Sequence, residues 1–246
     1  MPATTQSPRQ NDLLAALPPA EFARLQRHLE PVELALGGTV HELRSRQEFV
    51  YFPTTSLITL LHAMENGRTA GIALVGNEGM AGIALSMGGE TTPSRALVQR
   101  AGRGYRLRAS VLQTEFGRGA AFQHLLLRFT QALITQMAQT ALCSQRHSVA
   151  QQLCRWLLLS LDRVPGNELA MTQGMIANLL GAPAASVTEA AASLQTQQLI
   201  EYSGGKITVL NRSRLEARVC PCYARVKRES DRLLGQKYHW LEAAVA

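Results

Sequence analysis

The four cysteines are the residues whose chemistry first suggests a site. Cys220 and Cys222 stand one residue apart and could form half of a metal or redox centre. Cys143 and Cys154 lie far upstream, and we find no second Cys or His pair at a matching spacing, so the short C-x-C pattern is weak evidence for a metal. Cysteines this few and this late in a chain do not form a disulfide framework. The sequence therefore predicts reduced thiols and no metal site.

The histidines and glycines give no sign of catalysis. None of the six histidines pairs with a Ser or Cys nucleophile in a known motif, and no glycine-rich phosphate loop precedes a helix. The histidines are His28, His41, His62, His124, His147 and His239. We therefore do not expect an enzyme.

Charge is distributed unevenly along the chain. The formal net charge is +7, but residues 1–90 carry six basic and nine acidic residues, whereas residues 91–246 carry 19 basic and nine acidic residues. A basic C-terminal half indicates a polyanionic partner, and nucleic acid is the commonest one. No apolar segment approaches the roughly 20 residues of a bilayer-spanning helix, and no apolar export signal begins the chain. We therefore expect a cytoplasmic protein with no membrane partner.

Residues 171–210 have the spacing of a helix-turn-helix followed by a hairpin. Thr172 is a suitable N-cap for a helix over 173–180, Gly181 allows a tight turn, and a second helix is expected over 186–198. Helix, glycine-containing turn and helix in this order are typical of the helix-turn-helix motif. Two β-runs around residues 203–205 then predict a wing, and the chain continues as a basic helical tail.

The first half of the chain is expected to be a β domain. One or two short helices are predicted over 11–29, and short apolar runs separated by Gly, Pro and Asn-Gly follow over 32–107. The strongest turn signal is Asn66-Gly67, because Asn and Gly tolerate the positive φ of a two-residue hairpin turn. The number and spacing of the runs suggest a barrel or a sandwich.

A long helix is predicted over 120–144. Its apolar positions recur at spacings of three and four residues, at Leu126, Phe129, Leu133, Met137 and Thr140. A stripe this narrow is typical of a coiled-coil seam between two copies, although an ordinary core helix would show the same pattern. Another amphipathic helix is expected over 148–161, with Arg155 on its outer face.

The order of β domain, long helix and winged helix-turn-helix resembles the Crp/Fnr family of transcription regulators over nearly the whole chain. The residues that carry the resemblance are QQLCRWLL at 151–158, Met171-Thr172-Gln173, Leu179-Leu180-Gly181, Ser186-Val187-Thr188-Glu189-Ala190, Leu199-Ile200 and Gly205-Lys206-Ile207-Thr208-Val209. The resemblance implies an α+β fold: a β-roll or jelly-roll-like sensor barrel (1–118), a long dimerisation helix (119–145) and a winged helix-turn-helix with a basic tail (146–246). It also implies a homodimer that offers one reading helix to each major groove of a palindromic site.

The family's effector cassette is degenerate in this chain. Cyclic-nucleotide binders of the family hold the phosphate with an Arg in an Arg-Ser/Thr-Ala cluster and the ribose with a preceding Glu. The nearest match is Ser94-Arg95-Ala96, and Leu85, ten residues before Arg95, stands where the Glu would be. A leucine accepts no hydrogen bond from a ribose hydroxyl, so no such nucleotide is expected. Another small-molecule effector is left open, and its candidate residues are Glu78, Gly79, Gly82, Ser94 and Arg95.

The cofactors of other family members lack their ligands here. The family's iron-sulfur sensors use N-terminal cysteines, and no cysteine precedes Cys143. A haem would need an axial ligand, and His62 is a lone candidate that is better explained as a structural residue. We therefore expect no cofactor.

The predicted reading helix lacks the arginine with which typical relatives read guanine. No Lys or Arg occurs from Pro165 to Tyr202, so flanking cations would have to hold the DNA phosphates. The flanking candidates are Arg146, Arg155, Arg163, Lys206, Arg212, Arg214, Arg218, Arg225, Lys227 and Arg228. The candidate DNA-binding residues are Thr172, Gln173, Ala184, Ala185, Ser186, Thr188, Glu189, Lys206 and Arg212.

Two functions are compatible with these residues. The first is a dimeric transcription regulator with weakened or altered base specificity, whose partner is double-stranded DNA and for which RNA polymerase is left open as a further partner. The alternative is a signal-sensing or protein-interaction protein that keeps the fold but no longer reads DNA.

Overall fold

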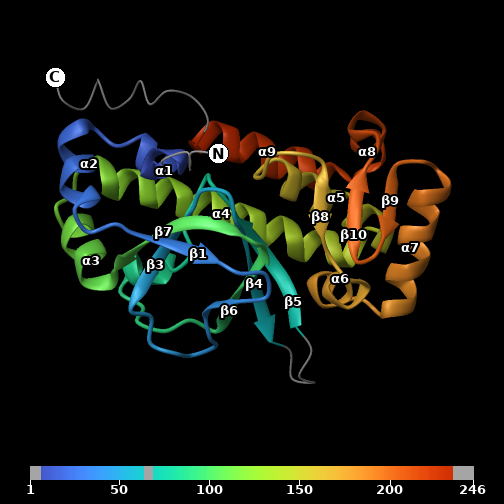
Figure 1. Cartoon of the computed structure of the whole chain (residues 1–246), viewed down its shortest axis with the longest axis horizontal. Helices are drawn as coiled ribbons and strands as arrows, with labels where there is room; N and C mark the ends of the chain where they lie inside the picture. Colours follow the sequence, from blue (N-terminus) through green and yellow to red (C-terminus); the bar gives the residue numbers. More distant parts are fainter. Residues whose placement is uncertain (1–6, 64–68, 235–246) are drawn as a thin grey trace, which may run out of the picture.

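The computed structural model describes residues 7–63 and 69–234. A β domain and a largely helical C-terminal part lie side by side along helix α4, and the last described helix, α9, returns along α4 (Figure 1). Within the described residues, no helix is both long and apolar enough to cross a bilayer.

The N-terminal part is an antiparallel β structure flanked by short helices. Its two sheets have the strand orders β1-β7-β3 and β2-β6-β4-β5. The elements are η1 (Pro8–Gln10), α1 (Asp12–Ala15), α2 (Pro19–Gln26), β1 (Glu30–Leu34), β2 (Thr39–His41), β3 (Phe49–Pro53), β4 (Leu57–Ala63), β5 (Thr69–Val75), η2 (Ile83–Met87), β6 (Ser94–Arg100), β7 (Gly102–Arg108) and α3 (Ala109–Gly117). The predicted α+β class is confirmed. The turn predicted at Asn66-Gly67 lies outside the described residues, although β4 and β5 on either side pair antiparallel.

One hydrophobic core fills the β domain and extends to helix α4 (Ala121–Arg146). Val50 and Ile58 on the two sheets are completely buried, and so is Leu14 of α1. Side chains of this kind stabilise a fold by roughly 1.5 to 3 kcal/mol each when fully buried. Phe129 of α4 packs directly on Gly79, where an added Cβ would lie 2.2 Å from the aromatic ring. The β domain and the long helix therefore form one packed unit.

Helix α4 confirms the predicted long helix. The residues predicted to form a seam between two copies instead face the β domain of the same chain. Leu126, Phe129 and Leu133 belong to the core of the β domain and are at most 4% exposed. Met137 packs against the same core. The stripe is therefore an intramolecular core face, which is the alternative that the spacing left open.

A different stripe of α4 is exposed. Leu127, Ile134 and Leu142 are 49%, 60% and 47% exposed, and the exposed Ala138 and Ala141 lie between them along the helix. Leu127, Ile134 and Ala141 follow one another at intervals of seven residues, which is the repeat of a coiled-coil seam. Helix α9 covers a neighbouring face of α4 and leaves this stripe open.

The C-terminal part is a winged helix-turn-helix. Its elements are α5 (Val149–Leu161), β8 (Glu168–Ala170), α6 (Gln173–Leu180), α7 (Ala184–Thr196), β9 (Ile200–Ser203), β10 (Lys206–Val209), α8 (Arg212–Arg218) and α9 (Pro221–Leu234). Ser148 begins α5 with a capping box, and Thr172 caps α6 by accepting a hydrogen bond from the Met175 amide, as predicted. Helix α7 begins at Ala184, two residues earlier than expected, because the fixed φ of Pro183 suits the entry to a helix.

Arg155 contradicts the pattern predicted for α5. The amphipathic spacing places it on the outer face, but in the structure it is 1% exposed. Its guanidinium donates to the Thr140 hydroxyl of α4 at 3.1 Å and lies 5.4 Å from the centre of the Trp156 ring. Helix α4 packs against α5, so a position that would be solvated on an isolated helix is enclosed between two helices.

Candidate nucleic-acid interface

Helices α6 and α7 meet at a tight turn that suits glycine. Gly181 has a φ of 61°, in the left-handed region that side chains disfavour. Ile176 of α6 and Val187 of α7 are completely buried, so the shared core fixes the angle between the two helices. The N-terminal half of α7 is thereby presented at the surface.

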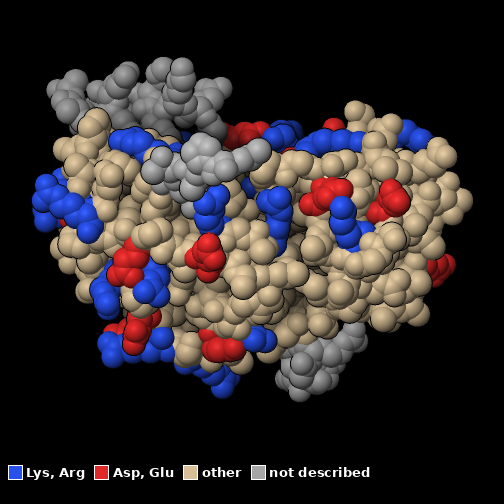
Figure 2. All heavy atoms as spheres, viewed as in Figure 1, with Lys and Arg blue, Asp and Glu red and all other residues tan. Residues whose placement is uncertain are grey.

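The exposed face of α7 carries small side chains and one acid. Ala184, Ala185, Thr188 and Glu189 are exposed, and Ser186 is half-buried. The Thr188 hydroxyl donates to the carbonyl oxygen of Ala184 at 3.0 Å, so toward a base this hydroxyl would act as an acceptor. In Figure 2 the surface over α6 and α7 is almost entirely tan. Base readout at this surface would depend on small groups and a carboxylate.

The wing turn lies beside the start of α6. Strands β9 and β10 pair antiparallel across Gly204 and Gly205, both of which have positive φ. A Cβ on Gly205 would lie 3.6 Å from the methyl carbon of Thr172. Three predicted DNA-binding residues, Thr172, Gln173 and Lys206, therefore lie at one edge of the domain.

The two cations among the predicted DNA-binding residues are engaged in ion pairs. Lys206 Nζ lies 2.6 Å from a carboxylate oxygen of Glu168 on β8, and both side chains are half exposed. Arg212 pairs with Asp162 at the end of α5 and with Glu216 on its own helix. Burial alone would lower the pKa of Arg212, but hydrogen bonds to these two carboxylates raise it. Arg212 therefore braces α8 against α5, whereas the exposed Lys206 pair is weak enough to exchange for a phosphate.

Most flanking cations lie away from the reading surface or inside the protein. Arg155 is buried, and the side chain of Arg163 is 8% exposed and pairs with Glu78. Five exposed flanking candidates lie on α8 and α9, at the opposite edge of the domain from α6 in Figure 1, where blue atoms gather in Figure 2. They are Arg214, Arg218, Arg225, Lys227 and Arg228. The basic tail is thus separate from α6, the wing and the N-terminal half of α7, although Arg218 lines a pocket with Ser193 and Gln197 at the other end of α7.

The five candidate effector residues are divided between different parts of the described structure. Arg95 lines a cavity of about 480 Å³ between the β domain and α6, and the buried Ser94 precedes it on β6. Glu78 lines another cavity, of about 190 Å³, beside α5 and α9. Gly79 packs on α4, and Gly82 turns the chain with a φ of 101°. Arg95 is therefore the one of the five that faces the larger cavity.

Glu78 forms a largely buried ion pair that joins the β domain to the winged helix-turn-helix. Its Oε1 accepts from Arg163 Nε at 2.7 Å, and the two side chains are 16% and 8% exposed. We expect Glu78→Gln to lower the free energy of unfolding by roughly 3 kcal/mol, because the buried guanidinium would lose its charged partner. Urea denaturation of both proteins measures the difference.

A surface pair provides the matched control for this prediction. Glu90 pairs with Arg46, and these side chains are 61% and 76% exposed. Glu90→Gln is expected to change the free energy of unfolding by less than about 1 kcal/mol. Equal effects of the two substitutions would contradict the bridging role of Glu78.

The structure brings together, at the end of α4, a group of cysteines and a histidine that the sequence alone did not pair. Cys143 and His147, four residues apart, form the second pair that was not identified from the sequence. The structure brings them to Cys220 and Cys222, with all four potential ligand atoms within 4.8 Å of one another. An i, i+4 spacing at the end of a predicted helix was the available signal, because such residues share one helix face.

Comparison with known proteins agrees with the geometry of the C-terminal part. Residues 151–218 match the family of Crp-like helix-turn-helix domains. This segment is a Crp-like domain. The match runs from α5 to α8, so the Crp-like domain includes the α6–α7 pair and the wing. No curated protein sequence matches the chain.

Solved structures extend the likeness to the whole fold. FixK2 from Bradyrhizobium japonicum has a TM-score of 0.66 and 19% identity, over 78% of this chain and 98% of FixK2. The c-di-GMP-responsive regulator CLP of Xanthomonas campestris has a TM-score of 0.62 and 13% identity, over 78% and 99%. TTHB099, a CRP-family transcriptional regulator from Thermus thermophilus, has a TM-score of 0.60 and 17% identity, over 84% of this chain and 99% of TTHB099. The chain therefore has the fold of the Crp/Fnr transcription regulators, with the Crp-like domain at its C-terminal end.

Proposed function

We propose that the chain is a DNA-binding transcription regulator of the Crp/Fnr type that acts in the cytoplasm. The observation that carries the proposal is the exposed N-terminal half of α7 beside the wing turn and the capped start of α6. In this motif the second helix enters the major groove while the first approaches the DNA backbone. Thr172 and Gln173 would then face phosphates, and the base edges would meet Ser186 and Glu189.

Base specificity is weaker than, or different from, that of regulators that read guanine with arginine. A bidentate arginine contact is worth roughly 1 to 3 kcal/mol of discrimination, so a symmetric dimer without two of them loses roughly 2 to 6 kcal/mol. The groups available instead are the Ser186 hydroxyl, the Glu189 carboxylate and the methyl groups of Ala184 and Ala185. Such groups suit a cytosine amino group and a thymine methyl group.

Binding to duplex DNA over a salt series, from about 50 to about 200 mM, tests the proposal. Wild-type protein is expected to bind duplex DNA at the lowest salt concentration. Lys206→Ala is expected to reduce the slope of the logarithm of the association constant against the logarithm of the salt concentration, by about 1 for each Lys206 that holds a phosphate. Lys227→Ala is the matched control, because Lys227 is also half exposed and ion-paired but lies on α9. No binding at low salt, to random duplex or to the protein's own upstream region, would contradict the proposal.

The exposed stripe of α4 supports a dimer. Leu127, Ile134 and Leu142 are large apolar side chains open to water on a helix whose opposite face is already packed. A two-fold axis through this stripe would bury it against itself, as isologous interfaces do. Two Crp-like domains would then be available for half-sites about one helical turn of DNA apart.

The larger cavity supports control by the N-terminal domain. Its walls come from β4, β5 and β6 on one side and from Met171, Met175 and Asn178 of the Crp-like domain on the other. Close by, Leu179 of α6 packs on Gly71 of β5, where an added Cβ would lie 2.8 Å from the leucine. A small molecule in this cavity would touch both parts, so its binding energy would favour one relative position of the two.

A sensor that keeps the fold without reading DNA is the second candidate. The observation that favours it is the charge of the motif: α6 and α7 contain no Lys or Arg, and Lys206 in the wing is paired with Glu168. Non-specific DNA affinity comes mostly from cations that release counterions, so this surface has little of it. The wild-type result of the salt series distinguishes the two functions.

A further inference from the structure

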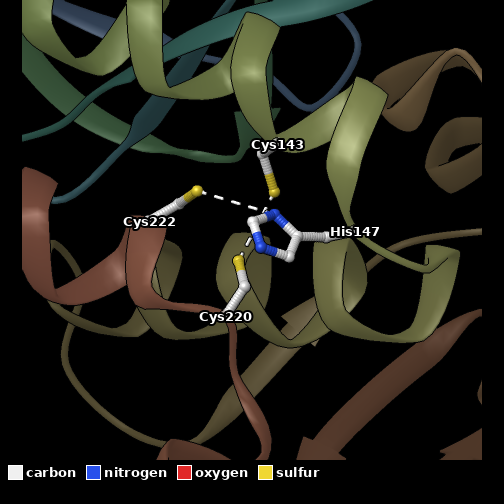
Figure 3. A group of neighbouring side chains, drawn as sticks. All are labelled: Cys143, His147, Cys220 and Cys222. Atoms are coloured by element: carbon white, nitrogen blue, oxygen red, sulfur yellow. Dashed lines mark hydrogen bonds between the residues drawn. The ribbon is translucent and has the colours of Figure 1, made fainter.

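Three cysteines and one histidine converge where α4 ends and α9 begins (Figure 3). Cys143 lies in the last turn of α4 and His147 is the residue that caps it, while Cys220 precedes α9 and Cys222 lies in its first turn. In the sequence, 77 residues separate Cys143 from Cys220 and 75 separate His147 from Cys222. The four side chains point toward one another in Figure 3.

The distances fit one tetrahedral metal ion. The sulfur atoms of Cys143 and Cys220 are 3.5 Å apart, and Cys222 Sγ lies 3.7 Å from His147 Nδ1. With Zn–S bonds of about 2.3 Å and a Zn–N bond of about 2.0 Å, a tetrahedral zinc separates two sulfurs by about 3.8 Å and a sulfur from a nitrogen by about 3.5 Å. An iron-sulfur cluster places its own sulfides between the ligands and needs a wider set.

Burial and charge around the group favour an ion with thiolate ligands. Cys143, Cys220 and Cys222 are 0%, 1% and 3% exposed, so three unused thiols would be packed against one another away from water. The buried Arg155 has no carboxylate partner in the described part of the chain, and it lies close enough to Cys143 and Cys222 to interact with them electrostatically. Three thiolates, a neutral imidazole and Zn²⁺ carry a net charge of −1, which this arginine would balance.

We infer that Cys143, His147, Cys220 and Cys222 form a structural zinc site. The donor set is Cys₃His with four protein ligands, which is a closed site without an open position for catalysis. Its two halves flank the Crp-like domain, since one pair precedes residue 151 and the other follows residue 218. The ion therefore clamps α9 to the end of α4 and fixes both ends of the DNA-reading domain to the helix that carries the exposed stripe.

Metal analysis of the purified full-length chain tests the site. The protein is prepared under reducing conditions and any affinity tag is removed. Inductively coupled plasma mass spectrometry is then expected to find about one zinc ion per chain. Cys222→Ser and His147→Ala are each expected to lower this to below about 0.2 zinc per chain, since a tetrahedral site depends on all its ligands. Cys154→Ala is the matched control, because Cys154 is equally buried but lies outside the group, and it is expected to retain the zinc.

A metal titration of the wild-type chain tests the zinc site even if the variants fail to fold. Chain stripped of metal with a chelator is titrated with Co²⁺, and one equivalent is expected to give the intense visible bands of tetrahedral, thiolate-ligated cobalt, which Zn²⁺ then displaces. Zinc is also expected to raise Tm by at least about 5 °C, because a ligand of the folded state stabilises it.

Several results would overturn the site, and none depends on DNA binding. They are a metal-free chain that takes up neither Co²⁺ nor Zn²⁺, iron with acid-labile sulfide in place of zinc, a Cys143–Cys220 disulfide in the reduced preparation, and equal zinc loss in Cys154→Ala. Because the readout is metal content, a failure of the proposed DNA-binding function would leave the zinc result unchanged.

Discussion

Ala184→Arg is expected to increase the preference of the protein for guanine-containing half-sites over random duplex by at least about 30-fold, since two new bidentate contacts per dimer contribute roughly 2 kcal/mol or more. Ala184 is exposed at the first helical position of α7, the end of a reading helix that approaches the base edges. No carboxylate on α6 competes for the new guanidinium. Anisotropy titrations with selected and random duplexes measure the ratio.

Ala192→Arg separates base reading from the mere addition of charge. Ala192 is also exposed on α7, but it lies more than two turns further from the N-terminal end. Its arginine is expected to raise the affinity for both duplexes alike and to leave the ratio unchanged. Equal ratios for the two variants, or no gain for Ala184→Arg, would mean that the start of α7 does not face the groove.

Ile134→Glu is expected to convert the proposed dimer to a monomer. Ile134 is 60% exposed at the centre of the stripe formed with Leu127 and Leu142, so in a two-fold dimer it would be buried near the axis. Losing two such side chains, each worth roughly 1.5 to 3 kcal/mol, raises the dimer dissociation constant at least about 100-fold. Two glutamates brought together at the axis add repulsion. Sedimentation velocity at micromolar concentration measures the change.

Ser144→Glu is the control for the dimer interface. Ser144 is exposed on the same helix but off the stripe, so its substitution is expected to leave the dimer intact. Far-ultraviolet circular dichroism should be the same for both variants, because neither side chain belongs to a core. A wild-type protein that sediments as a monomer at tens of micromolar would contradict the role given to the stripe.

Local signals in the sequence were sufficient to predict the helix-turn-helix. Thr172 caps α6 and Gly181 turns the chain because of properties of those residues alone, independent of distant contacts. The start of α7 was less well defined, since Pro183 and two alanines are compatible with a helix entry at several positions. The succession of short strands predicted the β domain in the same way, although not the pairing of the sheets.

Features that depend on packing partners were not predictable from periodicity. The stripe containing Leu126 and Phe129 is apolar because it meets the β domain, and spacing alone does not identify which surface covers a helix. Arg155 is buried for the same reason. The group of Cys143, His147, Cys220 and Cys222 was not predicted because Cys143 and Cys220 are 77 residues apart in the sequence, and only the return of α9 along α4 brings them together.

The central claim is that a dimer binds duplex DNA through α7, the start of α6 and the wing. Selection of bound duplexes from a random pool, followed by footprinting of the selected sequence, tests it most directly. We expect a two-fold symmetric site with half-sites about 10 base pairs apart, protected at the positions that α7 faces and lost with Ile134→Glu. A pool that shows no enrichment, or protection that persists unchanged in the monomeric variant, would contradict the claim.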